Sequence, residues 1–438
     1  MRWRWLVLLA AGCGGGTIEG DPALDGGGDA LEDGATDAAT SPDAIDGAVD
    51  VTSDAGDTGS GDTSSGDTGS APLDTGVVDT GSPTDAAPDA PAPIADPFFA
   101  ISPDEATWGD AQATTLRGLG AGTVRFQFCN WPADKAALEA KVEIARKHGL
   151  SVLAEINYCT LYAPAAAADR QAYWHASFSD AGNAFSAKFA AAAGEIAAAF
   201  KGRVARYEIW NEPNAAPRPK TGWPGTKWPS ATNADWDGAC GAYGYGVDYG
   251  QGDWAICPRQ LGVLTTNAFM AIVANDAAAK VVAGNVLFHG DDGWVAKEYW
   301  KQVEASPAVA WHVTNKGRRP WDEVGIHPYG YPPGGKLEAQ VKVFQALVTA
   351  PAKTVLTEYG WHSLSTADPN LYATEADAAK HLEATFPAMK AAGVPLVMWF
   401  NYLSAPGLDF GVRRADLSWK PAAKAYCKAT AAPKCPAP

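Results

Sequence analysis

The sequence predicts an α/β protein whose folded part is a closed barrel of eight parallel strands surrounded by helices. Two observations support this expectation. From Phe98 onward, short apolar runs alternate with Ala-rich stretches of helical character, and eight such pairs occur. The stretch 96–438 is also long enough to bury the core of one large domain.

The first 13 residues predict a signal peptide that ends at a lipid-modified cysteine. Arg2 and Arg4 supply its positive charge, and the apolar run 6–11 is too short to cross a bilayer as a helix. The segment 9–13, Leu-Ala-Ala-Gly-Cys, resembles a bacterial lipobox, although alanine stands at the usual leucine position. We therefore expect an exported lipoprotein of the cell surface or outer membrane, anchored through Cys13, with ordinary secretion as the alternative.

Residues 14–95 predict a disordered acidic linker. This stretch consists largely of Gly, Ala, Asp, Thr, Ser and Pro, and it holds 18 acidic residues with no lysine, arginine or aromatic residue. Such a composition cannot bury enough apolar surface to offset its ordering entropy, and its like charges repel. The linker would form an extended stalk in front of the domain 96–438.

The charge of the chain lies in this linker. Without the 18 acidic residues of the linker and the two arginines of the signal peptide, the formal net charge of −16 becomes zero for residues 96–438. The folded region therefore has no electrostatic preference for nucleic acid or for an anionic membrane. We expect a monomer that reaches the membrane through its lipid alone.

Six cysteines follow Cys13, and an even number in an exported protein predicts disulfides. Fifteen pairings are possible, and we favour Cys129–Cys159, Cys240–Cys257 and Cys427–Cys435, because each joins neighbours in the chain or on adjacent strands. The sequence has no Cys-x-x-Cys and no pair of histidines at metal-ligand spacing, so we expect neither a metal nor a cofactor.

The predicted strands and helices alternate along the whole folded region. The predicted strands are Phe98–Ile101, Val124–Phe128, Ser151–Ile156, Ala205–Trp210, Lys280–Leu287, Glu323–His327, Thr354–Glu358 and Pro395–Phe400. The helices that follow them are Trp108–Leu119, Lys135–His148, Asn183–Phe200, Gln260–Asn275, Trp294–Glu304, Leu337–Thr349, Glu375–Ala392 and Pro421–Lys428. Eight such units predict a (β/α)8 barrel, the TIM barrel.

An open, doubly wound parallel sheet is the main alternative to the closed barrel. That fold would place a Gly-rich dinucleotide-binding turn between its first strand and its first helix. Here the junction 102–105 reads Ser-Pro-Asp-Glu, so the alternative lacks its cofactor site.

Two glutamates stand where an active site belongs in such a barrel, at the C-terminal ends of the strands. Glu212 follows the fourth predicted strand and Glu358 ends the seventh, so the two can face each other across the barrel mouth. Cleavage of a glycosidic bond needs one protonated carboxyl to release the leaving oxygen and one ionised carboxyl to attack the anomeric carbon. In retaining enzymes the two stand about 5–5.5 Å apart.

The sequences around these glutamates resemble those of a known clan. Segment 210–213, Trp-Asn-Glu-Pro, resembles the acid/base motif of glycoside hydrolase clan A, and segment 357–360, Thr-Glu-Tyr-Gly, is similar to its nucleophile motif. The resemblance covers residues 96–438, and it points to the cellulase-like family five or the xylosidase/iduronidase-like family thirty-nine. It implies a retaining hydrolase of β-glycosidic bonds, with Glu212 as acid/base and Glu358 as nucleophile.

Other strand ends carry residues that would contact the substrate or support the glutamates. Arg125 resembles the clan's arginine that keeps the nucleophile ionised, with a structural ion pair as the alternative. Asn211 matches the asparagine that hydrogen-bonds the sugar 2-hydroxyl. Tyr329 would touch the nucleophile, and His327 would bond this tyrosine or a sugar. Further substrate-binding candidates are Asn157, Trp361 and Trp399, the last as a floor under the sugar ring unless it is a core aromatic.

Rival acidic residues suit the chemistry less well. Glu155 and Glu208 lie on the third and fourth predicted strands, and Asp291 and Asp292 follow the fifth. We expect these four as packing partners or loop charges. A Gly-x-Ser-x-Gly elbow, which serine hydrolases of α/β type require, does not occur in the sequence.

The loop 213–258 is rich in tryptophan and tyrosine, whose rings stack on the apolar faces of sugars. Its position after Glu212 favours endo action on an extracellular polysaccharide or oligosaccharide, although these aromatic residues would equally serve a small core of the loop itself. A surface lipoprotein that binds carbohydrate on the same barrel without cleaving it is the alternative function.

Overall fold

The computed structural model describes the chain from Asp96 onward with several gaps, and the described residues are 96–161, 181–214, 256–288, 294–329, 336–361, 374–404, 409–433 and 435. The predicted signal peptide with Cys13, the linker 14–95, most of the loop 213–258, and both Asp291 and Asp292 lie outside these residues.

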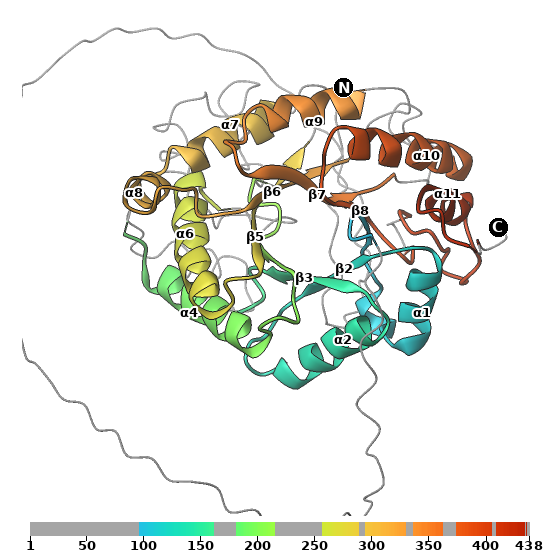
Figure 1. Ribbon diagram of the computed structural model, residues 1–438, viewed down its shortest axis with the longest axis horizontal. Helices are drawn as coiled ribbons and strands as arrows, with labels where there is room; N and C mark the ends of the chain where they lie inside the picture. The colour runs from blue at the N-terminus through green and yellow to red at the C-terminus, as the bar shows by residue number, and fades with distance from the viewer. Residues whose placement is uncertain are drawn as a thin grey trace, which may run out of the picture. The chain divides into compact units, whose positions relative to one another are not determined.

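The strands β1 to β8 close into a parallel barrel in chain order (Figure 1). The barrel closes because β1 pairs with both β2 and β8. The strands are β1 Phe99–Ile101, β2 Thr123–Gln127, β3 Ser151–Ile156, β4 Arg206–Ile209, β5 Lys280–Phe288, β6 Glu323–Pro328, β7 Lys353–Tyr359 and β8 Val397–Trp399. The predicted (β/α)8 barrel is confirmed, and each predicted strand overlaps one that is observed.

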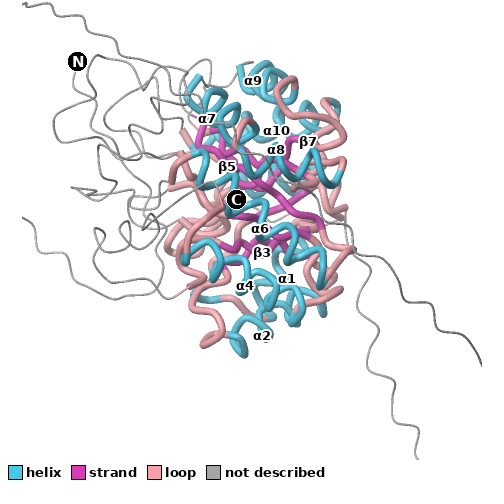
Figure 2. Tube along the Cα trace, turned by 90° about the vertical axis from the view of Figure 1, so that its left-hand side faces the viewer, coloured by secondary structure: helices cyan, strands magenta, loops and turns pink. Residues whose placement is uncertain are grey.

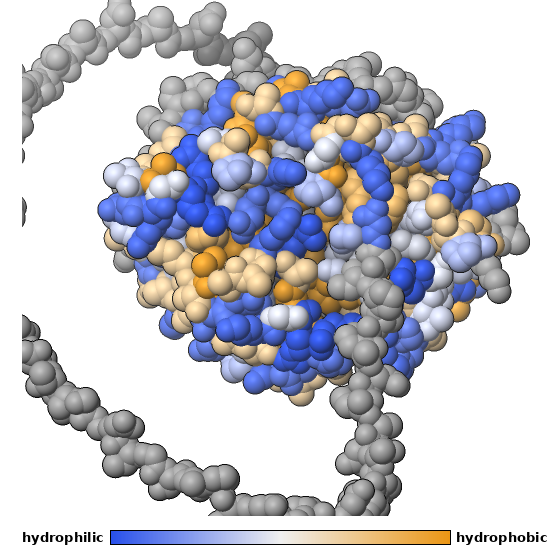
Figure 3. Space-filling view, in the orientation of Figure 1, coloured by the Kyte–Doolittle hydropathy of each residue, from blue (hydrophilic) through white to orange (hydrophobic). Residues whose placement is uncertain are grey.

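Helices form a ring around the strands (Figure 1), and a view turned by 90° shows the strands enclosed between them (Figure 2). They are η1 Glu105–Thr107, α1 Asp110–Gly118, α2 Lys135–Lys147, α4 Ala184–Ala199, α6 Pro258–Asn275, α7 Trp294–Glu304, α8 Pro307–Lys316, α9 Lys336–Gln345, α10 Glu375–Ala391 and α11 Pro421–Ala429. On the face in Figure 3, hydrophilic residues cover much of this outer ring. Among the helices of the described residues, none has both the length and the apolar character that crossing a membrane requires.

The helix α8 was absent from the prediction. It begins at Pro307, where the fixed φ of proline suits a first helical turn and the missing N–H has no partner to lose. Val309 and His312 of this helix are buried, while Trp311 is exposed.

The barrel interior is filled in layers, because side chains two residues apart on a strand point to the same face. Its middle is an apolar cluster that consists of Ala100, Leu153, Val282, Val355, Leu396 and Met398. At the first residues of β4 and β6, Arg206 Nε lies 2.8 Å from Glu323 Oε2, and both side chains are buried. Two residues beyond Leu153, toward the C-terminal ends of the strands, β3 carries Glu155, which opens the polar layer described below.

A bulge interrupts β5, where the register with β6 shifts between Ala283 and Val286. Gly284 and Asn285 have φ values of 91° and 48°, in the left-handed region that glycine and asparagine tolerate best. An extra residue in a strand re-aims a side chain. Here the bulge turns Asn285 into the barrel, where it is fully buried.

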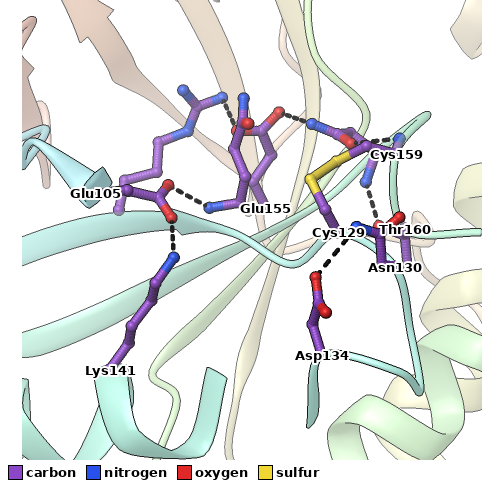
Figure 4. Close-up of a disulfide and its surroundings, with 11 residues drawn as sticks. Glu105, Cys129, Asn130, Asp134, Lys141, Glu155, Cys159 and Thr160 are labelled. Atoms are coloured by element: carbon purple, nitrogen blue, oxygen red, sulfur yellow. Dashed lines mark hydrogen bonds and ion pairs between the residues drawn. A yellow bond between two sulfur atoms is a disulfide. The ribbon is translucent and has the colours of Figure 1, made fainter. Parts of the chain in front are cut away.

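Two of the predicted disulfides are present, Cys129–Cys159 and Cys427–Cys435. Cys257 is also disulfide-bonded, and its predicted partner Cys240 lies outside the described residues. The first bond joins the segments that follow β2 and β3, beside Glu155 (Figure 4). In addition, Asn130 N donates to Cys159 O at 2.8 Å, so these two segments are held together by both covalent and hydrogen bonds.

Glu323→Gln should destabilise the barrel much more than a matched surface change. It leaves the buried Arg206 without a full carboxylate partner, and breaking a buried ion pair from one side costs about 3–5 kcal/mol. Glu143→Gln weakens a surface pair with Arg203 and should cost about 1 kcal/mol or less. Urea unfolding of both variants measures the two losses, and equal losses would contradict this view of the interior.

Candidate active site

Arg125, on β2, is the buried centre of the polar layer. Its Nε and Nη2 donate to Glu208 at 2.6 and 3.0 Å, and Nη2 also donates to Asn211 Oδ1 at 3.0 Å. The same Nη2 lies 3.0 Å from Glu155 Oε2, while Nη1 donates to Glu358 Oε1. A guanidinium can serve four partners in this way because its five N–H groups form a planar fork.

Glu358, near the end of β7, is held in its ionised form. Besides Arg125, its Oε2 accepts a hydrogen bond of 2.6 Å from the Tyr329 hydroxyl and lies 3.7 Å from His327 Nδ1. Burial on its own raises the pKa of Glu358, but the charges of His327 and Arg125 and the bond from Tyr329 outweigh burial and lower it. An ionised carboxylate is the form that can act as a nucleophile.

Glu212 follows β4 on a strained stretch of backbone. Trp210 and Glu212 have φ values of 70° and 43°, which are costly for residues with a side chain and persist where the surroundings hold them. Asn214 supplies one such support, because its amide donates to Leu287 O at 2.8 Å and accepts from Leu287 N at 2.7 Å. These two bonds tie the segment after Glu212 to β5.

The surroundings of Glu212 favour its protonated form. Burial raises the pKa of Glu212, the negative charge of Glu358 adds to this, and the contact with His327 lowers it by less. Glu212 Oε1 lies 3.1 Å from His327 Nδ1. The site thus pairs a carboxyl that keeps its proton with one that loses it, which is the division of roles that an acid and a nucleophile require.

Glu212 and Glu358 converge on one point. Each offers a carboxylate oxygen, and His327 a ring nitrogen, such that these atoms all lie within 4.8 Å of one another. All three residues are buried at the C-terminal ends of their strands. The two glutamates therefore face each other, as their positions at the strand ends suggested.

His327, on β6, is a buried cation in this site. Burial on its own lowers the pKa of His327, but the charge of Glu358 and contacts with Glu208 and Glu212 outweigh it and raise the pKa to about 10. Its Nε2 lies 3.0 Å from Thr357 Oγ1. The close spacing of His327 with the two glutamates would suit a metal ion, but an ion would have to displace the proton on Nδ1.

Glu155 and Glu208, which the sequence suggested as packing partners, both contact Arg125. Burial raises the pKa of Glu155 to about 8, and nearby carboxylates add to the effect against the opposing charge of Arg125. Glu155 and Glu212 are thus the glutamates of the site whose pKa is raised, while the pKa of Glu358 is lowered.

Three further predicted residues lie around this layer, and their contact with a substrate stays a prediction. Asn157 is buried, donates to Glu155 and accepts from Cys159 N at 2.8 Å. Trp399 is fully buried, packs edge-on against the Tyr359 ring and donates to Phe410 O at 3.1 Å, as a core aromatic would. Trp361 packs against His381, with the ring centres 4.6 Å apart.

Asn285 and Thr357 belong to the site and were missed from the sequence. Thr357 Oγ1 donates to Asn285 Oδ1 at 3.1 Å, and both residues are fully buried. Two signals could have found them. A glycine directly before Asn285 inside an apolar strand indicates a bulge, and Thr357 immediately precedes the nucleophile candidate.

Comparisons with known proteins return distant structural likenesses. No family model matches the chain. No curated protein matches it in sequence either. A family 39 glycoside hydrolase from Bacteroides cellulosilyticus is 15% identical with a TM-score of 0.49, over 77% of this chain and 64% of that one. A β-galactosidase from Marinomonas ef1 is 12% identical with a TM-score of 0.49, over 76% of this chain and 59% of that one.

A thermostable mutant of a xylanase from Cellvibrio japonicus is 16% identical with a TM-score of 0.46, over 78% of this chain and 98% of that one. This chain thus spans about three fifths of the length of the first two structures. At these identities the likeness concerns the barrel fold.

Glu155→Gln should flatten the fall of stability with rising pH. The pKa of Glu155 is about 8 in the folded protein and near 4.5 in an unfolded chain. The folded state therefore keeps a proton that the unfolded state loses, so the wild type loses stability as pH rises from about 4.5 to about 8. Glutamine does not titrate, so the variant should lack this part of the loss.

Urea unfolding of Glu155→Gln and the wild type between pH 5 and pH 8 measures this difference. The variant should become more stable relative to the wild type as pH rises, because only the wild type loses stability through the ionisation of Glu155. Parallel pH dependences of the two free energies of unfolding would show that Glu155 is already ionised in the folded protein.

Proposed function

We propose that this protein is a retaining glycoside hydrolase, with Glu358 as nucleophile and Glu212 as acid/base. The observation that carries the proposal is the pairing of these two buried carboxyls, whose oxygens lie within 4.8 Å with opposite pKa shifts. Inverting enzymes hold the two carboxyls about 6.5–9.5 Å apart to admit a water, so the shorter spacing supports direct attack.

In the first step, Glu358 attacks the anomeric carbon while the proton of Glu212 passes to the glycosidic oxygen, which leaves as an alcohol. The result is a covalent glycosyl ester on Glu358. In the second step, Glu212, now ionised, takes a proton from a water that attacks the same carbon and releases Glu358. Two inversions at that carbon retain its configuration.

Three neighbours support the first step. Arg125 and Tyr329 bond the two oxygens of Glu358, which fixes the carboxylate and keeps it charged. Asn211 is held by Arg125 through its Oδ1, so its amide N–H groups are the part that could donate to a sugar hydroxyl. Such a bond strengthens as positive charge develops on the ring.

For the substrate we propose a β-linked polysaccharide or oligosaccharide outside the cell, cleaved at internal bonds. The support is the clan resemblance of segments 210–213 and 357–360, together with the aromatic composition of the loop 213–258. A screen of the protein on plant and microbial polysaccharides, with the anomer of the first product followed by NMR, tests both substrate and stereochemistry. Binding without any new reducing end would favour the non-catalytic alternative.

Glu358→Ala and Glu212→Ala should fail in different ways. Loss of the nucleophile should lower kcat on every substrate, by at least about four orders of magnitude. Loss of the acid should cost about 10²–10⁴-fold on unactivated glycosides and much less on a dinitrophenyl glycoside, whose leaving group needs no proton. Azide should restore turnover to the second variant and give a β-glycosyl azide.

The pH profile provides the control for these roles. In the wild type, activity should rise as Glu358 ionises and fall as Glu212 loses its proton, whose pKa is raised. Glu212→Ala should lose the alkaline limb alone. Normal turnover by Glu358→Ala would sink the assignment of roles.

We further propose that the protein is an exported lipoprotein anchored through Cys13, on the support of its lipobox-like segment 9–13. Cells that express the wild type should incorporate labelled palmitate into it and retain it in the membrane fraction. Cys13→Ser should take up no label and be released. A labelled Cys13→Ser variant, or an unlabelled wild type, would contradict the anchor.

A further inference from the structure

A chain of buried hydrogen bonds runs behind Glu212, from the end of β4 through β5 and β7 to β6. Asn285 Nδ2 donates to the carbonyl oxygens of Ile209 and Trp210, at 3.2 and 2.9 Å. Asn285 Oδ1 accepts from Thr357 Oγ1 at 3.1 Å, and Thr357 Oγ1 lies 3.0 Å from His327 Nε2.

The direction of each bond in this chain follows from the one before it. Two carbonyl oxygens can only accept, so the amide nitrogen of Asn285 faces them and its oxygen faces Thr357. That oxygen also only accepts, so the hydroxyl proton of Thr357 points to it. A lone pair of Thr357 Oγ1 is then left for His327, and Nε2 must carry a proton to use it.

Space for this chain is made by a glycine. A Cβ atom at Gly325, on β6, would lie 1.9 Å from Asn285 Oδ1 and 3.0 Å from Thr357 Oγ1. Gly325 does not have a left-handed backbone that would demand glycine. The absence of a side chain at this position is therefore explained by the room that Asn285 and Thr357 occupy.

We propose that Asn285 and Thr357 are positioning residues that keep a proton on His327 Nε2 and hold the strained end of β4 that carries Glu212. The proposal rests on the proposed function, since it assigns how the acid/base is aimed. The two residues touch no reacting atom, and they act through His327 and through the carbonyls of Ile209 and Trp210.

The proton on Nε2 leaves Nδ1 to serve Glu212. Besides Thr357, four groups face the His327 ring: Glu208 at 3.8 Å, Glu212 at 3.1 Å, Glu358 at 3.7 Å, and the Tyr329 ring from the same strand. Three of them are carboxyls, which favour a charged imidazole, while burial opposes it. Thr357 favours the protonated imidazole, because its oxygen accepts from Nε2–H and a buried N–H without an acceptor is costly.

Thr357→Val tests the chain, because valine has the shape of threonine without the acceptor oxygen. The full-length chain labelled with ¹⁵N-histidine reports the protonation of each ring nitrogen by NMR, and His327→Gln identifies the signals. In the wild type both nitrogens of His327 should carry protons at neutral pH. In Thr357→Val the titration should move down by about one to two pH units.

Thr357→Ser is the matched control, since it keeps the hydroxyl and should titrate as the wild type does. Gly325→Ala is a second route to the same result, because its methyl group displaces Asn285 and breaks the chain from the other side. An unprotonated Nε2 in the wild type, or equal titrations of His327 in Thr357→Val and Thr357→Ser, would overturn the proposal.

Kinetics give a readout that a purely structural role would not move. The charge of His327 lowers the pKa of both Glu358 and Glu212. With its pKa lowered from about 10 by about one to two pH units, His327 in Thr357→Val is still charged where Glu358 ionises, so the acidic limb of the pH–rate profile should stay in place. The alkaline limb, where Glu212 loses its proton beside a histidine that now loses its charge earlier, should shift to higher pH, whereas Thr357→Ser keeps both wild-type limbs. An unshifted alkaline limb beside a shifted histidine titration would refute the link to Glu212.

The NMR titration needs no substrate, which separates the two hypotheses. If the wild type cleaves no glycoside while His327 responds to Thr357→Val, the proposed function is wrong and the hydrogen-bond chain stands. If glycosides are cleaved and His327 does not respond, the chain is wrong and the proposed function stands.

Discussion

The guanidinium of Arg125 is buried inside the barrel, and the rest of the polar layer depends on its need for charged and hydrogen-bonding partners. A buried charge is costly unless carboxylates and hydrogen bonds surround it. Glu208, Glu358 and Glu155 all contact it, and His327 adds a second cation nearby. These two cations lower the pKa of Glu358, while burial raises the pKa of Glu155 and Glu212. The split between acid and nucleophile follows from this balance.

The backbone around Glu212 departs from regular geometry, and this departure sets the direction of the Glu212 and Asn285 side chains. The segment after β4, in which Trp210 and Glu212 have positive φ values, lies beside the bulge at Asn285 in β5. Hydrogen bonds from Asn285 and Asn214 join these two irregular segments. Each irregularity thus supports the other, as is expected where strain accompanies a functional site.

The residues that stabilise the barrel and the residues proposed for the chemistry lie at different depths of the same interior. The ion pair of Arg206 with Glu323 and the apolar cluster around Leu153 fill the barrel below the site. The polar layer lies at the C-terminal ends of the strands, the edge at which barrels of this kind carry their active sites. Because the layers share the same strands, the lower ones hold Glu155 and Glu208 in register for Arg125.

Local pattern in the sequence was enough to predict the barrel and the two glutamates. Strand and helix periods depend on neighbours within a few residues, and strand ends in a parallel barrel meet at one edge. The helix α8 and the bulge at Asn285 escaped prediction, because they depend on packing between distant segments. The protonation of Glu155, Glu212 and His327 was decided by tertiary structure alone, since a pKa responds to charges that only folding brings within a few ångströms.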